Sequence, residues 1–373
     1  MATRVAFVLP YLNGGGAERA VLELAAESRL QCTILTERPG GDLSDHPLAT
    51  AVQCLDVAGG RLVRTTRLAG AVRARRIDVL VSVLSPVVVA AAGQSQRMPV
   101  ITWIQNPLTE VVRPVPESGR PQVRDRVARL VGAASAAVAG TAPGIRDEWR
   151  RAGLPDDRTC VLPNGTRLPE GVRRQRTGGG ELRLLSVGRL VPQKRHDLAI
   201  TALADLRSCG CPASLEILGR GTAEASLRTL AARLGIAEHV TFAGFVSDPS
   251  PRYRAADVFV LTSDFEGFGN VLVEALAHEL PVVATDAPYG PRFILDGLRG
   301  ARLVARGSSA AVAQAIREVV GEWRANPSLA LAARQRAGAF AVQRTADHFD
   351  LIVDAVLARG PLPQWSTGGL TGG

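Results

Sequence analysis

The two halves of this 373-residue chain begin with the same succession of elements, an apolar strand, a glycine-containing turn and a helix. In the first half, residues 4–10 lead into glycines within 13–16 and a helix expected over 19–27. In the second half, residues 181–187 lead into a glycine turn and a helix expected over 196–206. A short apolar run followed by apolar residues at helical spacing indicates a β-α unit. The repeated beginning predicts two doubly wound α/β domains.

Further short apolar runs follow in each half, separated by segments long enough for helices. The expected strands span 31–36, 79–84, 100–104 and 136–139 in the first half, and 214–218, 240–242, 258–261, 282–284 and 301–304 in the second. This alternation is typical of parallel sheets covered on both faces. We expect a Rossmann-like domain over residues 1–170, a linker rich in arginine and glycine over 171–180, and a second Rossmann-like domain over 181–345.

The C-terminal part of the chain has a different pattern. Amphipathic stretches fill residues 310–323 and 329–357. We expect a helix at 346–359 to pack back on the first domain. Residues 360–373, rich in Gly, Pro, Ser and Thr, are expected to form a flexible tail.

Apolar runs and cysteines restrict the class of protein. No stretch approaches the roughly 20 consecutive apolar residues that span a membrane. Pro10 also interrupts the N-terminal apolar run, which argues against a signal segment. We therefore expect a cytoplasmic protein. The five cysteines are an odd number without metal-ligand spacing, and we interpret them as core or loop residues.

Most of the net charge of +9 lies in residues 1–176. Between Arg61 and Arg76, six arginines occur without an acidic residue. The apolar stripe of the same helix would consist of Leu62, Leu68, Ala69 and Val72. Such a segment suits an anionic membrane surface or an anionic acceptor, so the protein is expected to bind peripherally to the inner face of the cell membrane. The alternative is an ordinary solvated helix. Nucleic acid is not expected as a partner, because aromatic residues are only 4% of the chain and do not interleave with the arginines.

Lys194 is the only lysine among the 44 Lys and Arg residues. It lies in Gly188-Arg189-Leu190-Val191-Pro192-Gln193-Lys194, between the first strand and first helix of the second half. An open α/β sheet binds phosphate at such a turn. An ammonium on a flexible stem can act as a point charge on a diphosphate where a planar guanidinium would not fit. The alternative is a surface lysine left by chance, and the surrounding motif favours the phosphate-binding role.

A second glycine turn follows the apolar run at 258–261 and contains two carboxylates. Glu266 precedes the expected helix, Glu274 lies one to two turns inside it, and Gly267 and Gly269 stand between them. Carboxylates at two heights along one turn can accept hydrogen bonds from two polyhydroxyl groups, such as a hexose and a ribose, with phosphates between them. The alternative is that Glu274 is solvated and Glu266 complements the helix dipole.

Six motifs, in this order over about residues 5–350, resemble those of the retaining nucleotide-sugar glycosyltransferases of family 4. The motifs are Asn13-Gly14-Gly15-Gly16-Ala17-Glu18-Arg19, Val161-Leu162-Pro163-Asn164-Gly165, Val187-Gly188-Arg189 with Gln193-Lys194, Leu218-Gly219-Arg220-Gly221, the stretch from Glu266 to Glu274, and Leu280-Pro281-Val282-Val283-Ala284-Thr285-Asp286. Each motif alone is weak, but the ordered set is specific. The resemblance implies the GT-B fold, in which two doubly wound Rossmann-like domains face a central cleft.

The resemblance also implies roles for individual residues. Arg189 and Lys194 would bind the donor diphosphate and stabilise charge on the leaving nucleotide without a metal or other cofactor. Glu266 matches the residue that faces the donor sugar, and Glu274 the one that holds the ribose hydroxyls. The expected catalytic residues are thus Arg189, Lys194 and Glu266. Further donor contacts are implied for Gly188, for the backbone of Gly267, Phe268, Gly269 and Asn270, for Phe245 and Val246 at the base, and for Gly15 and Gly16 in the loop that closes over the reacting centre.

Two positions depart from the family pattern. Many relatives have a histidine where this chain has Gln105 and Asn106, so a neutral side chain would have to hydrogen-bond the donor sugar. Many relatives also have Gly-Pro-Arg-Glu where this chain reads Gly290-Pro291-Arg292-Phe293. The donor-sugar contact expected from the glutamate is absent there, and Arg292 is expected to reach phosphate or acceptor instead.

The leading hypothesis is an enzyme that moves a hexose or N-acetylhexosamine from a UDP-sugar to a glycan, lipid-linked or small-molecule acceptor. Retention without an obvious nucleophile fits a same-face mechanism, in which the leaving phosphate takes the acceptor proton. Three alternatives stay open: a GDP-mannose-dependent transferase of natural-product biosynthesis, a catalytically silent scaffold that binds nucleotide-sugar, and a sugar-nucleotide epimerase.

Overall fold

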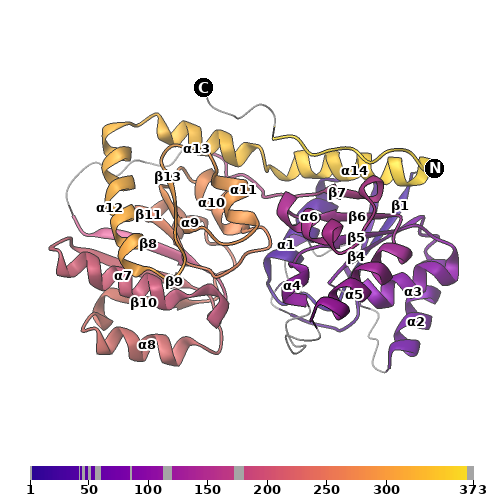
Figure 1. Ribbon diagram of the computed structural model, residues 1–373, viewed down its shortest axis with the longest axis horizontal. Coiled ribbons are helices and arrows are strands. Elements are labelled where there is room, and N and C mark those ends of the chain that lie inside the picture. The colour runs from indigo at the N-terminus through magenta and orange to yellow at the C-terminus, as the bar shows by residue number, and fades with distance from the viewer. Residues whose placement is uncertain are drawn as a thin grey trace. The chain divides into compact units, whose positions relative to one another are not determined.

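The computed structural model describes residues 2–41, 43, 47–48, 52–54, 60–84, 86–111, 120–171 and 180–367 (Figure 1). Most of the linker expected over 171–180, and residues 368–373 of the expected tail, lie outside this part of the chain. The described residues form two compact units. The first contains the chain up to Arg167 together with Phe340–Thr367, and the second contains Leu168–Ala339.

The first unit is built on a parallel sheet, which among the described residues has seven strands in the order β3-β2-β1-β4-β5-β6-β7. The strands are β1 Arg4–Leu9, β2 Gln31–Thr36, β3 Val52–Cys54, β4 Val79–Val83, β5 Val100–Ile104, β6 Ala137–Gly140 and β7 Thr159–Val161. Val5 of β1 pairs with Cys32 on one side and Val79 on the other. The strand order reverses direction at β1 and β4, which defines a doubly wound sheet.

Helices cover both faces of this sheet (Figure 1). Their bounds are α1 Gly16–Glu27, α2 Arg61–Ala74, α3 Pro86–Gln96, α4 Leu108–Val111, α5 Arg120–Ala134, α6 Pro143–Arg151 and α14 Val342–Ala358, with a short turn η3 at Asp156–Arg158. On one face α1 and α14 bury apolar side chains against β1, and the rings of Phe7 and Phe349 lie 5.2 Å apart. On the other face Leu68 and Val72 of α2 pack with Ala6 and Val8.

The second unit repeats the architecture with a parallel sheet, which within the described residues has six strands in the order β10-β9-β8-β11-β12-β13. The strands are β8 Leu182–Val187, β9 Ala213–Leu218, β10 Val240–Gly244, β11 Val258–Leu261, β12 Val282–Thr285 and β13 Ala301–Val304. The direction of winding changes between β8 and β11. All five strands expected after the first in this half are present, within two residues of their expected ends.

The helices of the second unit form a layer on each side of its sheet (Figure 1). Their bounds are η4 Pro192–Lys194, α7 His196–Ser208, α8 Glu224–Arg233, η5 Ala237–His239, α9 Ser250–Ala255, α10 Asn270–Ala277, α11 Gly290–Leu295, α12 Ser309–Ala325 and α13 Leu329–Gly338. The helices α7, α8 and α12 bury Leu203, Leu227 and Ile316 in one core with β8 and β9.

The amphipathic stretch expected over 329–357 is divided into two helices, α13 and α14, at Ala339–Ala341. Backbone hydrogen bonds at this break tie the chain to the first unit, because Thr166 N donates to Phe340 O at 3.0 Å and Val342 N donates to Thr166 O at 3.0 Å. The first unit therefore resumes at Phe340, before the expected boundary at 346. The periodicity of apolar residues continues through the break, so it did not reveal this boundary.

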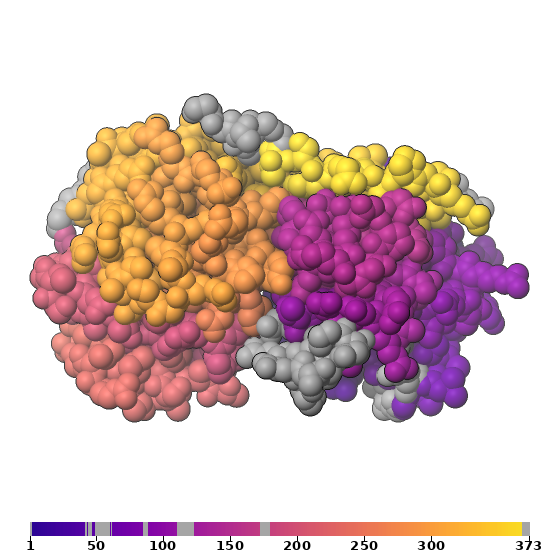
Figure 2. Space-filling model, viewed as in Figure 1, coloured from indigo at the N-terminus to yellow at the C-terminus, as the bar shows by residue number. Residues whose placement is uncertain are grey.

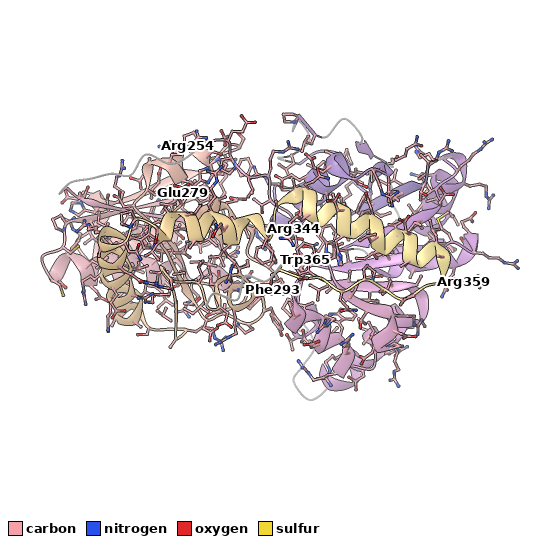
Figure 3. The ribbon with its side chains drawn as sticks, turned by 90° about the horizontal axis from the view of Figure 1, so that it is seen from above. Arg254, Glu279, Phe293, Arg344, Arg359 and Trp365 are labelled. Carbon is pink, nitrogen blue, oxygen red and sulfur yellow. The ribbon has the colours of Figure 1, made fainter. Side chains whose placement is uncertain are left out.

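Residues 360–367, expected as part of a flexible tail, pack on the first unit. Leu362 contacts the core that α1 and α14 share. Trp365 lies edge-on to His348 with ring centroids 5.1 Å apart, and Arg344 Nη2 donates to Ser366 O at 3.1 Å. Figure 3 shows Arg344 and Trp365 side by side. The yellow segment covering part of the first unit in Figure 2 includes α14 and these residues.

The helix expected between Arg61 and Arg76 is α2, but its apolar stripe is shorter than expected. Leu68, Ala69 and Val72 are buried, whereas Leu62 is 77% exposed and Val63 is 42% exposed. Within the described part of the chain, no helix combines the length and apolar character needed to cross a membrane.

Candidate active site

The expected site residues of the second unit lie in turns that follow the carboxyl ends of its strands. Gly188 and Arg189 follow β8, Phe245 and Val246 follow β10, and the stretch from Glu266 to Asn270 follows β11. In a parallel sheet these turns meet along one edge, and ligands bind there near the change in winding direction. The sequence pattern thus selected residues from neighbouring turns of one sheet edge.

The turn after β9, residues 219–221, is in backbone contact with the turn after β8 and with the end of β10. Leu190 N donates to Arg220 O at 2.9 Å, and Gly219 N donates to Gly244 O at 2.7 Å. A Cβ atom on Gly219 would lie 2.0 Å from Gly188 O, and one on Gly221 would lie 2.2 Å from Leu190 O. Gly219 also has φ of +139°, which favours glycine. The glycines of the 218–221 motif are therefore required by packing against the turn that contains Arg189.

Lys194 and Glu266 form an ion pair in the second unit. Lys194 Nζ lies 2.7 Å from Glu266 Oε1, and the two side chains are only 15% and 7% exposed. Ser263 Oγ donates to the same carboxylate oxygen at 2.5 Å. A buried carboxylate is stabilised when it is paired and hydrogen-bonded. Because an ammonium has three N–H donors, Lys194 can bind Glu266 and still donate to a ligand oxygen.

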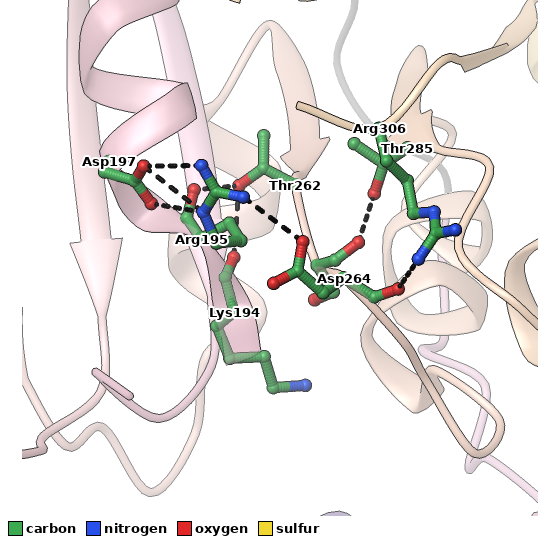
Figure 4. A network of polar contacts seen from close by, with 8 residues as sticks. Lys194, Arg195, Asp197, Thr262, Asp264, Thr285 and Arg306 are labelled. Atoms are coloured by element: carbon green, nitrogen blue, oxygen red, sulfur yellow. Dashed lines mark hydrogen bonds and ion pairs between the residues drawn. The ribbon is translucent and has the colours of Figure 1, made fainter. Parts of the chain in front are cut away.

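The backbone on either side of this pair is fixed by a network of polar contacts (Figure 4). Arg195 has φ of +48° and contacts Asp197 at 2.9 Å and Asp264 at 3.3 Å. Thr262 Oγ1 donates to Arg195 O at 2.8 Å, and Arg306 Nη1 donates to Asp264 O at 3.1 Å. The ion pairs and the Thr262 bond hold Arg195 in a left-handed conformation that a non-glycine residue adopts at a cost. They fix the turn that presents Lys194.

Gln193 links the same two segments through its side chain and its backbone. Its Nε2 donates to Phe265 O at 2.8 Å, and its carbonyl accepts from Asp264 N at 2.9 Å. The turn bearing Lys194 and the turn bearing Glu266 are thus joined by side-chain and main-chain hydrogen bonds. Such preorganisation reduces the cost of aligning charged groups with a ligand.

His196 lies beneath the Gly188 turn as the first residue of α7 and is buried. Its Nδ1 is 3.2 Å from Ser186 Oγ. Burial lowers the pKa of His196 to about 4, and the charge of Lys194 acts in the same direction. The imidazole is therefore neutral at neutral pH, and the charge in this part of the site comes from Lys194.

Glu274 lies on α10, and its carboxylate is held by a tyrosine. Tyr253 OH on α9 donates to Glu274 Oε2 at 2.8 Å. The tyrosine is fully buried, and its ring stacks on His278 with centroids 5.0 Å apart. Glu274 is therefore not a freely solvated helix residue.

The turn from Gly267 to Asn270 packs against the turn that precedes α11. A Cβ atom on Gly290 would lie 1.7 Å from Phe268 O, and Gly290 N lies 3.4 Å from Glu266 O. Gly269 has φ of +96° and directly precedes α10, which begins at Asn270. The glycines at 269 and 290 therefore set the path of the backbone around Glu266.

Two arginines expected at the site differ in their contacts. Arg189 is exposed, and no described residue forms an ion pair with it. Arg292, expected to reach phosphate or acceptor, forms an ion pair with Asp286 and has an exposed side chain. Arg189 is therefore a solvent-exposed cation next to the Lys194 turn.

The four expected residues of the first unit lie after β1 and β5. Gly15 precedes α1, which begins at Gly16 rather than at 19, and a Cβ atom on Gly15 would lie 2.3 Å from Glu18 Oε2. Gln105 is buried, and its Oε1 accepts from Asn164 Nδ2 at 3.1 Å. Asn106 is exposed.

Sequence reasoning missed Tyr253, Ser263 and Asp264 as parts of the site. Tyr253 is 21 residues before Glu274 and on another helix, so no local pattern links the two. Ser263 and Asp264 lie three and two residues before Glu266, just after β11. A polar pair at the end of an apolar strand is a usable sign of a site residue. Among the described residues, no group of His, Cys, Asp and Glu side chains is arranged to hold a metal ion.

Two family models match the chain, and together they span most of it. "Glycosyl transferase 4-like domain" matches residues 15–165, and "Glycosyl transferases group 1" matches residues 172–336. The chain belongs to the GT-B glycosyltransferases of the family 4 type.

Curated relatives match part of the chain. It is 35% identical over 219 residues to the GDP-mannose-dependent alpha-(1-6)-phosphatidylinositol monomannoside mannosyltransferase of Mycolicibacterium smegmatis, covering 56% of this chain and 52% of that one. It is 37% identical over 250 residues to the D-inositol 3-phosphate glycosyltransferase of Geodermatophilus obscurus, covering 61% and 55%. The chain thus spans about half the length of these relatives.

A solved structure resembles the whole fold. The Anabaena protein HepE, in complex with UDP and glucose, has a TM-score of 0.81 and 20% identity, over 95% of this chain and all of that one. This likeness confirms the GT-B fold expected from the sequence.

Proposed function

We propose that the chain is a retaining glycosyltransferase that moves a hexose or N-acetylhexosamine from a UDP-sugar to a glycan, lipid-linked or small-molecule acceptor. The observation that carries the proposal is the Lys194–Glu266 ion pair at the carboxyl edge of the second sheet, beside the exposed Arg189. Family membership supports it, because the match to "Glycosyl transferases group 1" spans residues 172–336, which include these three positions.

In this proposal the chain's residues act through charge and position. Lys194 and Arg189 bind the diphosphate and stabilise the negative charge that develops as the sugar leaves. Glu266 contacts the donor sugar, and Glu274 accepts hydrogen bonds from the ribose. The departing phosphate oxygen takes the proton of the acceptor hydroxyl on the same face of the sugar, so the anomeric configuration is retained. The cations on the chain make a metal ion unnecessary, and transfer should persist in EDTA.

The nucleotide is tested by thermal shift with UDP, GDP and their sugars on the wild type and on Lys194→Ala. We expect one nucleotide series to raise the Tm of the wild type and the variant to lose most of that rise. Arg299→Ala, which removes an exposed arginine outside the site, is the matched control and should keep the full rise. Failure of every nucleotide to stabilise the wild type would contradict the proposal.

GDP-mannose is the alternative donor, and a specific observation favours it. The mycobacterial relative described above is named as GDP-mannose-dependent. The same thermal-shift series distinguishes the two donors, since stabilisation by GDP and not by UDP assigns the alternative. Measured transfer to an acceptor that is abolished by Lys194→Ala would exclude a silent scaffold, and NMR of the anomeric proton in the product reports retention.

We also propose that α2 contacts an anionic membrane surface. Leu62 and Val63 are exposed in the same helix as Arg64, Arg67 and Arg73. Apolar side chains beside arginines suit a lipid interface. Binding to vesicles with anionic lipid should weaken with added salt and with Leu62→Ser, whereas equal binding to neutral vesicles would contradict the proposal.

A further inference from the structure

We propose that Tyr253 is a positioning residue for the nucleotide's ribose, because its hydroxyl fixes the carboxylate of Glu274. This inference rests on the proposed function, in which Glu274 accepts hydrogen bonds from the ribose hydroxyls. Tyr253 does not itself touch the ligand in this proposal. It acts through the carboxylate.

The contact between the two residues is short and shielded. Tyr253 OH lies 2.8 Å from Glu274 Oε2, and the tyrosine side chain has no exposed surface. A hydrogen bond from a neutral donor to a carboxylate is among the stronger ones in proteins. Burial excludes water that would compete for the phenol hydroxyl, so the bond determines where Oε2 lies.

The tyrosine ring is itself held on two sides. Phe259 of β11 lies with its ring centroid 5.8 Å from that of Tyr253, at an interplanar angle of 45°. His278 stacks on the ring with an interplanar angle of 16°. His278 is anchored in turn, since its Nδ1 donates to Glu274 O at 2.8 Å. The phenol hydroxyl is thus attached to a rigid support built from β11, α9 and the end of α10.

A fixed carboxylate is a better acceptor for a diol than a mobile one. A glutamate on a helix loses rotamer entropy when a ligand immobilises it, and this loss weakens binding. Tyr253 removes that loss by ordering the side chain in advance. Each carboxylate oxygen has two lone-pair sites, so Oε2 can accept from Tyr253 and Glu274 can still accept from both ribose hydroxyls.

The test uses the full-length chain and compares nucleotides with and without the ribose hydroxyls. Dissociation constants for UDP, GDP and their 2′,3′-dideoxy counterparts are measured by calorimetry on the wild type and on Tyr253→Phe. Phenylalanine keeps both ring contacts and removes only the hydroxyl. We expect the Kd of the ribonucleotide that binds to rise about tenfold and the Kd of its dideoxy counterpart to change less than about twofold.

Two further variants separate positioning from a structural role. Ser250→Ala removes a hydroxyl from the same helix and should leave every Kd unchanged. In a Glu274→Gln background, Tyr253→Phe should have little further effect on the ribonucleotide, because the two residues act in series. Glu274→Gln alone, which does not depend on the folding of Tyr253→Phe, should weaken binding of the ribonucleotide more than that of its dideoxy counterpart.

The outcomes are distinct. Equal weakening of ribonucleotide and dideoxynucleotide by Tyr253→Phe would assign a purely structural role and overturn the inference, as would an unchanged Kd for both. If the wild type binds a nucleotide and Tyr253→Phe binds it with the same Kd, the proposed function still stands. A wild type that binds no nucleotide overturns the proposed function, and the inference with it.

Discussion

Lys194 shows how a single residue type is fixed by its surroundings. Its stem packs along Gly188, where a Cβ atom would lie 3.5 Å from Lys194 Cδ, and its ammonium pairs with a carboxylate that also accepts from Ser263. The buried pair stabilises the fold only while both charges are present, because one partner alone is an uncompensated buried charge.

We predict that Lys194→Met lowers the free energy of unfolding of the second unit by about 3–5 kcal/mol, because it leaves Glu266 charged and unpaired. Adding Glu266→Gln should restore part of the loss. Chemical denaturation of the two variants and the double variant measures the coupling. Additive losses in the double variant would show that the two side chains do not depend on each other.

His196 makes the stability of the folded chain depend on pH. Its pKa of about 4 in the folded chain lies below the value near 6.5 of an unfolded histidine. Between these values the unfolded state binds a proton and the folded state does not, so stability falls as pH drops from 6.5 toward 4. The shift corresponds to about 3 kcal/mol of unfolding free energy.

The measurement is the unfolding free energy of the wild type and His196→Gln between pH 7.5 and 4.5. We expect a shallower pH dependence in the variant. The remaining slope includes His278 and His348, since burial lowers the pKa of each. Identical slopes for the two proteins would show that His196 is already protonated, or not buried, in the folded chain.

The sequence pointed to some residues of the candidate site and missed others. Lys194, Glu266 and Glu274 were found because glycines and an apolar strand stand next to them in the sequence. Tyr253 was missed because it reaches Glu274 only through the packing of α9 against α10. A contact between two elements leaves no periodicity in either one.

Among the elements, the turns after β8 and β9 depend on each other. The glycine at 221 faces the backbone of Leu190, with a would-be Cβ 2.2 Å from its carbonyl oxygen and 2.8 Å from its nitrogen. Backbone atoms cannot move aside as a flexible side chain can. An added methyl group there must separate the two turns.

We predict that Gly221→Ala lowers the free energy of unfolding by about 1–3 kcal/mol and weakens nucleotide binding, because the shift reaches Arg189. Gly321→Ala is the matched control. A Cβ on Gly321, within α12, meets nothing within 4 Å, so alanine there should stabilise by about 0.5–1 kcal/mol. Denaturant unfolding measures whether each variant is less or more stable than the wild type. A Gly221→Ala variant that is more stable would contradict the close approach of Gly221 to the backbone of Leu190.

The bounds of strands and helices were predicted where local sequence determines them, and missed where a distant contact does. The strands at 31–36, 100–104, 258–261 and 301–304 have the bounds that the sequence predicted. The short strands β3 and β7 were not predicted, because three residues carry too little pattern. The break between α13 and α14 was missed because its cause is pairing with Thr166, far away in the sequence.

For the whole molecule, the repeated strand–turn–helix beginning was sufficient to predict two doubly wound domains. The GT-B class was implied by the resemblance of six motifs to the family 4 glycosyltransferases. Each unit has its own apolar core, with Phe7 and Phe349 in the first and Leu203 and Ile316 in the second. The sequence also suggested a C-terminal helix on the first domain, and α14 packs on α1 and β1.

We predict that Phe349→Ala destabilises the first unit by about 3–5 kcal/mol and leaves the second unchanged. Hydrogen exchange followed by mass spectrometry should show faster exchange in β1, α1 and α14, and unchanged exchange in β8, β9 and α7. Faster exchange spread evenly over both units would show that they unfold as one.

The position of α14 also sets an order of events during translation. Within the described residues the second unit is one continuous segment, Leu168–Ala339, so all of it has been synthesised before α14 is made. The first unit, although synthesised earlier, lacks one wall of its core until Val342–Ala358 emerges. The apolar surfaces of β1 and α1 therefore stay uncovered in the nascent chain until α14 is available. Chaperones bind apolar surface that is exposed in this way.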